Sequence, residues 1–205
     1  NAMNGIHDLG GMDGFGEVVQ VENEPNFYKE WEKTAFAILF GLSSKGVIRN
    51  LDEFRHGFER MNPAHHIISP YYAKWLSSSE TLLVERGILD AEELESRTKT
   101  FLENPDTKIP RKEKPELWKN VKELIRTGAS TVRQVSSSPR FKVGDKVKTK
   151  NLHPKGHTRL ARYVRDKYGT INKVYDAHVF PDASAHGKGD CPQYLYSVTF
   201  DAGEL

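Results

Sequence analysis

Two periods of hydrophobic residues divide the chain into halves. From Asn26 to Leu102, apolar residues recur at spacings of three and four, which is the period of a helix that buries one face. After Pro139, apolar and polar residues alternate, which is the period of a half-buried β-strand. The sequence therefore predicts an α+β protein with a helical N-terminal half and a C-terminal half of short strands.

The helical half contains residues that mark where helices begin. Asn50 and Asp90 each precede an apolar stripe and are typical N-caps, whereas Ser69 is expected to cap a helix that starts at Pro70. A further helix is expected over residues 116–128. The apolar face of the first helix is expected to consist of Phe27, Trp31, Ala35, Ile38 and Leu42.

Three alternating stretches predict the strands of the second half. They span residues 140–151, 168–180 and 194–201, and the first of them turns at Gly144–Asp145. Short strands separated by glycine and proline favour a small closed or half-closed barrel. We therefore expect the C-terminal half to be an SH3-like β-barrel.

The beginning of the chain fits neither period. Five glycines lie between positions 5 and 16, and each costs a helix about 1 kcal/mol relative to alanine. Because Ile6, Leu9 and Phe15 are nevertheless apolar, we expect an extended arm that buries these residues on another subunit. Asn1–Ala2 is interpreted as a cloning remnant. The expected division is an arm (1–25), a helical domain (26–103), a linker with one helix (104–138) and the barrel (139–205).

The composition argues against several classes of protein. The 30 Lys and Arg residues against 28 Asp and Glu residues give a formal net charge of +2, so the overall charge does not favour nucleic acid or a membrane surface. No apolar stretch is long enough to span a bilayer, and the N-terminus lacks the layout of a secretory signal. Cys191 is the only cysteine, which excludes an intrachain disulfide and a cysteine-based metal cluster. We expect a cytoplasmic protein.

Two segments could carry chemistry by themselves. His153 and His157 have the spacing of a metal pair, but the intervening proline and glycine break any helix that would aim them together, so we interpret them as solvated. Residues 159–168 interleave arginines with tyrosines. This stretch is open to three interpretations: a surface for RNA or DNA, a strand with solvated arginines, or one buried arginine that holds an anion bidentately.

Aromatic residues gather in a second region, at the start of the helix that follows Ser69. Tyr71 and Trp75 are four residues apart and share a helix face, with Tyr72 beside them. Such a cluster can be core, or it can line an apolar pocket with a hydroxyl at its edge.

Seven separated blocks of the sequence resemble the β subunit of nitrile hydratase. In chain order they are MNGIHDLGGMDGFG, EWEKTAFAI, LDEFRHGFERMNP, SPYYAKW, PKGHTRLARYVR, YGTI with HVFPD, and CPQYLY. The blocks lie in both halves, so the resemblance covers essentially the whole chain. A helical half followed by an SH3-like barrel agrees with that family.

The resemblance implies a lyase that hydrates small nitriles to amides as an α/β heterodimer, with a dimer of heterodimers left open. It implies a trivalent cobalt or iron ion that the α subunit holds through backbone nitrogens and cysteines, two of them oxidised, with no ion bound by this chain. Trp75 stands where the family's cobalt members tend to carry tryptophan, which favours cobalt. The chain alone is expected to be inactive.

The resemblance also carries over site residues by motif. Arg55 in DEFRHG and Arg159 in GHTRLA fall on the two arginines that hydrogen-bond the oxidised cysteines, and Tyr71 falls on the tyrosine that contacts the metal loop. The choice of Arg159 among the neighbouring arginines comes from the resemblance alone. The positions that match the walls of the nitrile pocket are Leu51, Phe54, Trp75 and Phe40.

Two departures and two alternatives accompany this interpretation. The family continues past residues 203–205 with a further strand or two, and Lys74 stands where related chains often carry an uncharged or weakly basic residue.

The alternatives are a non-catalytic SH3-like barrel that binds nucleic acid, of the kind called KOW, and a non-catalytic protein that binds an α subunit. The near-zero net charge weighs against the nucleic-acid alternative.

Overall fold

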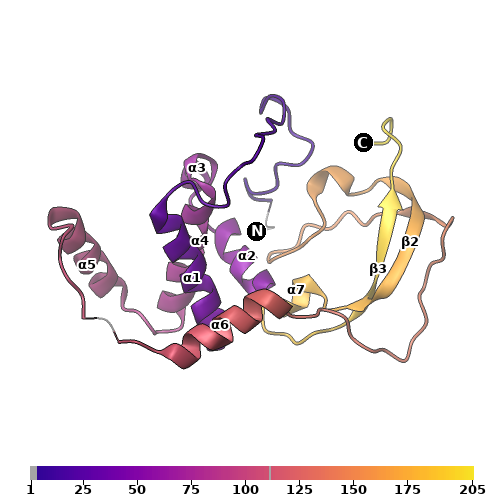
Figure 1. The fold of residues 1–205 in the computed structure, drawn as a ribbon. Coiled ribbons are helices and arrows are strands. Elements are labelled where there is room, and N and C mark those ends of the chain that lie inside the picture. Colours follow the sequence, from indigo (N-terminus) through magenta and orange to yellow (C-terminus); the bar gives the residue numbers. More distant parts are fainter. Residues whose placement is uncertain (1–3, 111) are drawn as a thin grey trace. The chain divides into compact units, whose positions relative to one another are not determined.

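The computed structural model describes residues 4–110 and 112–205 (Figure 1), and the chain forms two compact units. We call the first the strand unit; it combines the residues up to Asn26 with residues 50–68 and 130–205. We call the second the helical unit; it contains residues 27–49 and 69–129. The chain therefore passes between the units more than once, and the segment around Arg55 groups with the C-terminal strands rather than with its neighbours in sequence.

The described residues of the helical unit form four helices: α1 (Glu30–Ser44), α4 (Tyr71–Glu85), α5 (Ala91–Glu103) and α6 (Pro115–Thr127). Both α4 and α6 pack against α1, and Figure 1 shows α1 and α4 side by side. The residues buried between these three helices are Ala35, Leu39, Leu82 and Val121. No residue of α5 is buried.

The buried face of α1 differs from the predicted one. Ala35 is buried as expected, but Trp31 and Ile38 are 36% and 37% exposed, while Leu39 is 1% exposed. Glu32 is also buried, because its carboxylate accepts hydrogen bonds from the backbone N–H groups of Tyr28 and Lys29 at 2.5 and 3.1 Å. The buried face of α1 therefore includes Glu32, whose carboxylate pairs with unsatisfied N–H groups at the helix start.

The predicted helix caps are mostly confirmed. Asp90 Oδ1 accepts hydrogen bonds from the N–H groups of the first turn of α5, at 2.9 and 3.0 Å. Pro115 starts α6, and Gly128 follows its end with a positive φ of 65°. The exception is α4, where Pro70 rather than Ser69 is the N-cap.

The strand unit holds three strands and short helices. The helices are α2 (Leu51–Glu59), α3 (Pro63–Ile68), α7 (Pro181–Ser184) and the 3₁₀-helix η1 (Arg162–Val164). Strands β1 (Lys146–Lys148), β2 (Tyr168–His178) and β3 (Gln193–Thr199) form an antiparallel sheet in the order β1-β2-β3. β2 pairs with β3 along most of its length (Figure 1).

The described strands form an open sheet rather than a closed barrel. β1 has three residues, because the chain turns at Gly144 with φ of 91° just before it. β2 is longer, and its pairing with β3 shifts register between Ile171 and Lys173 and again between Val174 and Ala177. Such irregularities bend a strand and raise its twist. Only the coarser prediction, short antiparallel strands in the C-terminal part, is confirmed.

Residues 4–26 contain neither helix nor strand, which agrees with an extended arm. Ile6 and Leu9, however, are half-buried within the strand unit itself, whereas Phe15 is 58% exposed. The first part of the arm therefore buries part of its apolar surface within this chain, whereas the sequence predicts burial on another subunit. Residues 1–3, the remainder of the predicted arm, lie outside the described residues. Within the described part of the chain, no helix combines the length and apolar character needed to cross a membrane.

Candidate functional site

Arg55 lies on α2, a helix whose start is fixed by the predicted cap. Asn50 Oδ1 accepts a hydrogen bond from the N–H of Glu53 at 2.8 Å, which satisfies one of the unpaired donors of the first turn. Arg55 Nη1 donates to Asp52 Oδ1 at 3.1 Å, and the Arg55 side chain is 41% exposed. The aspartate thus fixes one end of the guanidinium and leaves part of it accessible.

Arg159 lies in the irregular segment before η1. It is exposed, and its side chain makes no hydrogen bond or ion pair within residues 4–110 and 112–205. The turn on either side is ordered, because the N–H of Leu160 donates to Thr158 Oγ1 at 3.2 Å. An exposed guanidinium on an ordered turn can bind a partner without first breaking an internal ion pair.

His157 connects the segments that carry the two arginines. Its side chain is fully buried, with Nδ1 2.7 Å from Glu59 Oε1 and Nε2 3.9 Å from Asp52 Oδ1. Both carboxylates belong to α2, and Asp52 is the same residue that hydrogen-bonds Arg55. The strand unit thereby joins the helix of Arg55 to the loop of Arg159 through one imidazole ring.

Glu59 is the acceptor at the centre of this network. Burial alone would raise the pKa of Glu59, but the hydrogen bonds from His157 and His56 outweigh it and lower the pKa to about 2. His56 Nδ1 lies 3.0 Å from Glu59 Oε2, and His7 Nε2 of the arm lies 4.0 Å from Glu59 Oε1. Burial lowers the pKa of His7. Glu59 is therefore an anion at neutral pH and has three imidazoles around it.

The same residues are the described group whose side chains could hold a metal ion. One ligand atom each from His56, Glu59 and His157 lies within 4.8 Å of the others. Both Glu59 oxygens already take part in hydrogen bonds with the Nδ1 atoms of these histidines. A metal ion would have to replace those two hydrogen bonds, so the hydrogen-bonded network accounts for the cluster by itself.

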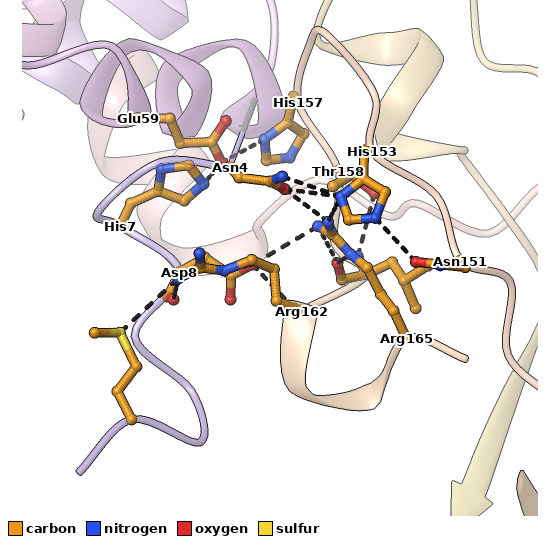
Figure 2. Close-up of polar contacts among 12 residues, drawn as sticks. Asn4, His7, Asp8, Glu59, Asn151, His153, His157, Thr158, Arg162 and Arg165 are labelled. Atoms are coloured by element: carbon orange, nitrogen blue, oxygen red, sulfur yellow. Dashed lines mark hydrogen bonds and ion pairs between the residues drawn. The ribbon is translucent and has the colours of Figure 1, made fainter. Parts of the chain in front are cut away.

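The other histidine of the HPKGH motif, His153, has different partners. His153 contacts Asn4 through Nδ1 at 3.0 Å and Asn151 through Nε2 at 2.9 Å. The two histidines of the HPKGH motif thus belong to separate networks (Figure 2).

The buried arginine of the basic stretch is Arg165. It is 6% exposed, and its Nε and Nη2 atoms donate to the carbonyl oxygen of Leu160 at 3.1 and 2.9 Å. One arginine of this stretch is therefore buried, as one of the three interpretations has it, but both of these nitrogens donate to a single neutral carbonyl oxygen rather than to an anion. Another arginine of the stretch, Arg162, makes an ion pair with Asp8 of the arm.

Three of the aromatic residues predicted for the site, Tyr71, Trp75 and Phe40, lie in the helical unit. Trp75 contacts Tyr71, Tyr72 and Phe36, with ring centroids 5.6, 5.2 and 5.9 Å apart. Phe36 in turn contacts Phe40 at 4.5 Å. Tyr71 is 63% exposed, so one edge of the cluster faces outward. The cluster is thus a continuous aromatic surface with a phenol at its rim.

Leu51 and Phe54 of α2 differ in their surroundings. Leu51 is 52% exposed, whereas Phe54 is 2% exposed and packs edge-on against Phe58 at 4.9 Å. Phe54 therefore contributes to the core of this chain, and Leu51 is available at its surface.

Comparisons with known proteins name the family. Residues 3–122 match the family model of the nitrile hydratase β subunit N-terminal region, and residues 130–205 match that of the C-terminal region. The cobalt-containing nitrile hydratase β subunit of Pseudonocardia thermophila is 46% identical over 204 residues, 99% of this chain and 87% of the relative. The chain belongs to the nitrile hydratase β-subunit family.

Other members of the nitrile hydratase β-subunit family give the same result. A nitrile hydratase β subunit of a Rhodococcus species is 43% identical over 99% of this chain and 86% of its own length. A low-molecular-weight cobalt-containing β subunit of Rhodococcus rhodochrous is 37% identical over 99% of this chain and 90% of its own.

Within this nitrile hydratase β-subunit chain, the structure distributes the predicted site residues over both units. Arg55, Arg159, Leu51 and Phe54 lie in the strand unit, and the others, Tyr71, Trp75 and Phe40, lie in the helical unit.

Sequence reasoning did not identify the acidic residues that organise the arginines. Asp52 and Glu59 look like ordinary solvated helix residues in the sequence, and His157 is expected there to be solvated. The available signal is their helical spacing, since Asp52, Arg55, His56 and Glu59 recur at three and four and so lie on neighbouring positions of α2. Their pairing with His157 depends on contacts across about 100 residues of sequence, which no local pattern encodes.

Proposed function

We propose that this chain is the β subunit of a nitrile hydratase, a lyase that hydrates nitriles to amides as an α/β complex. The observation that carries the proposal is the match to the β-subunit family along nearly the whole chain. The relatives found are nitrile hydratase subunits, and none of them supports a non-catalytic protein that binds nucleic acid or an α subunit.

We propose that the α subunit holds the metal ion and that the ion is cobalt. The support for cobalt is that two relatives are named as cobalt-containing and that tryptophan stands at position 75. This chain has one cysteine, so it does not offer a set of thiolate ligands. When bound, the ion supplies Lewis-acid chemistry that polarises the nitrile or a water molecule.

Arg55 and Arg159 fit the role of binding anionic sulfur oxygens on the partner. Guanidinium is planar and donates two parallel hydrogen bonds, which matches an acceptor with two oxygens. Arg159 has no competing internal partner among the described residues, and Arg55 keeps part of its guanidinium exposed beside Asp52. In this proposal the two arginines fix the partner's oxidised cysteines, and so orient the ligands of the metal.

The aromatic cluster is proposed to form the apolar wall of the nitrile site. Trp75 and Phe40 offer apolar surface, and the exposed Tyr71 offers a hydroxyl to the α subunit. Leu51 is proposed to add apolar surface from α2, and Phe54 to support it from the core. An apolar wall with few polar groups suits a small nitrile, since it excludes water from all but the reacting end.

Finer features of the assembly are also proposals. We propose that the open sheet and its loops correspond to an SH3-like barrel, and that the domains divide in chain order at about residues 103 and 139. The break between the two family models, after residue 122 and before residue 130, supports a boundary in this region. The proposal also includes an α/β heterodimer in the cytoplasm, with pairing into a dimer of heterodimers left open.

The proposal is tested with lysine variants in the assembled complex. Arg55→Lys and Arg159→Lys should each lower kcat for nitrile hydration by about 10- to 100-fold, because lysine keeps the charge and loses the paired hydrogen bonds. Arg97→Lys on α5, whose exposed arginine pairs with Glu93 at 3.1 Å, is the matched control and should leave kcat unchanged. Near-full activity of both site variants would mean that other residues hold the anion.

A further inference from the structure

From Asn4 onward, the arm is hydrogen-bonded to the loop that carries Arg159, through the contacts drawn in Figure 2. Asn4 Oδ1 accepts a hydrogen bond from Arg165 Nη1 at 2.9 Å, and Asn4 Nδ2 donates to His153 Nδ1 at 3.0 Å. The two segments are about 150 residues apart in sequence. The arm therefore contacts this loop within the same chain.

Asp8 makes the densest set of these contacts. Its Oδ2 atom accepts a hydrogen bond from the backbone N–H of Arg162 at 2.9 Å, and its carbonyl oxygen accepts one from Arg162 Nη2 at 2.9 Å. The same Oδ2 atom lies 3.7 Å from Arg162 Nε and 3.7 Å from Arg165 Nη2. One carboxylate of the arm thus faces two arginines of the loop.

Arg165 needs this carboxylate because its charge is buried. Its side chain is 4% exposed, and Asp8 is the carboxylate within ion-pair distance of it in the described part of the chain. Removing the counter-ion of a buried cation strongly destabilises the folded state. Arg165 also donates two hydrogen bonds to the carbonyl oxygen of Leu160, the residue next to Arg159. Removing the Asp8 carboxylate is therefore expected to disturb the backbone at Leu160.

Arg159 stands between two fixed points of the loop. On one side Leu160 is held by Arg165, which depends on the arm. On the other side His157 is held by Glu59 and donates its backbone N–H to His186 Nε2 at 3.0 Å. The hydrogen bonds of His157, two residues before Arg159, and of Leu160, directly after it, thus restrain the backbone on both sides of Arg159.

A pair of glycines lets the arm approach the loop closely. A Cβ atom on Gly10 would lie 2.7 Å from the Tyr163 ring, and one on Gly11 would lie 2.6 Å from Tyr163 Cβ. Gly11 also has φ of 71°, a conformation that side chains disfavour. These two glycines of the arm are therefore required by its contact with η1, not by a need for flexibility.

We propose that the arm is a positioning element for the candidate anion-binding arginine: Asp8, assisted by Asn4, holds Arg159 in place through Arg162 and Arg165. This inference rests on the role that the proposed function gives to Arg159. Asp8 is a positioning residue and touches neither the substrate nor the metal ligands in this scheme.

The test is a double-mutant cycle in the assembled α/β complex, measured as nitrile hydration. Asp8→Ala should lower kcat by about 10-fold with little change in KM, since it displaces Arg159 without altering the apolar pocket. In the Arg159→Lys background, Asp8→Ala should lower kcat by less than about 2-fold, because the group that it positions is already gone. Asp176→Ala on β2, an exposed aspartate of the same unit, is the control and should leave kcat unchanged.

A second measurement separates the arm contact from catalysis. Amide hydrogen exchange at Arg162, whose N–H donates to Asp8, should be faster by about 10-fold or more in Asp8→Ala than in the parent complex. Asp8→Asn keeps an oxygen that can accept this hydrogen bond, so it serves if the alanine variant does not assemble, and it should show a smaller loss of kcat.

Each outcome decides between the two proposals. If Asp8→Ala lowers kcat by the same factor in both backgrounds, Asp8 does not act through Arg159 and the positioning role is wrong. If Asp8→Ala leaves kcat unchanged while Arg159→Lys lowers it, the positioning role is again wrong and the proposed function stands. If Arg159→Lys has full activity, the role of Arg159 fails, and faster exchange at Arg162 would leave the arm contact as a structural one only.

Discussion

At the scale of single residues, burial and hydrogen bonding have opposite effects on the pKa of Glu59. Burial favours the neutral acid, but two histidine donors favour the anion and win, which places the pKa at about 2 against an ordinary value of 4.5. A carboxyl whose pKa is lowered on folding stabilises the folded state at pH values above its unfolded pKa. That contribution is lost as the pH falls from about 4.5 toward 2.

Glu59→Gln should therefore remove part of the acid sensitivity of the chain. The free energy of unfolding of the parent chain should fall as the pH is lowered from 4.5 to 2, and the slope should be shallower in the glutamine variant because glutamine does not titrate. Urea unfolding followed by circular dichroism at several pH values measures both slopes. Equal slopes would show that Glu59 is not held as an anion by the histidines.

The different burial of Phe54 and Leu51 gives a second prediction at this scale. Phe54→Ala should lower the free energy of unfolding by about 3–5 kcal/mol because it leaves a cavity in the core. Leu51→Ala, at a half-exposed position, should cost less than about 0.5 kcal/mol. Thermal unfolding separates the two, and a raised KM for nitrile in the Leu51 variant would support its place in the apolar wall.

At the scale of elements, α2 organises the strand unit. It presents Asp52, Arg55 and Glu59 from successive turns, and its start is joined to α7 because Asn50 Nδ2 donates to the carbonyl oxygen of Ser184 at 3.1 Å. Asn50 thus satisfies a helix donor with one atom of its amide and links two helices with the other.

Asn50→Ala should cost more than an ordinary loss of a cap. Removing an N-cap costs about 1 kcal/mol, and here the link to Ser184 is lost as well. Asp90→Ala is the matched control: it removes the cap of α5, a helix with no buried residue, so it should lower helix content without lowering the main unfolding temperature. Equal unfolding temperatures for both variants would contradict the organising role of α2.

At the scale of the whole molecule, the chain exposes an arginine and several apolar residues at its surface. Arg159 is exposed with no internal partner among the described residues. Two arm residues beyond the glycine pair, Val18 and Val19, are 91% and 82% exposed. These exposed groups agree with the proposed α/β complex, in which the active site would be shared between the subunits.

The assembled complex should therefore contain cobalt and hydrate nitriles, whereas this chain alone should be inactive. The prediction is checked by co-expressing the chain with its α subunit in medium that contains both cobalt and iron, and then measuring metal content and amide formation. An active complex that contains iron would refute the choice of metal, and activity of the chain alone would refute the shared site.

How much of this protein the sequence predicts depends on the range of each interaction. The helices α2, α5 and α6, the capping roles of Asn50 and Asp90 and the long strands β2 and β3 follow from local patterns, because helix caps and alternating residues act over a few positions. Resemblance to the β-subunit family named Arg55 and Arg159, which local patterns alone do not distinguish from other arginines.

Only the tertiary structure decided which of these groups meet. The short helices α3 and α7, the open sheet and the buried face of α1 depend on packing between elements, which overrides local preference. The same holds for His157, which is buried between two carboxylates of α2, and for Asp8, which pairs with arginines more than 150 residues away. A counter-ion is chosen by distance in space, because the energy of a buried charge depends on what surrounds it and not on its place in the chain.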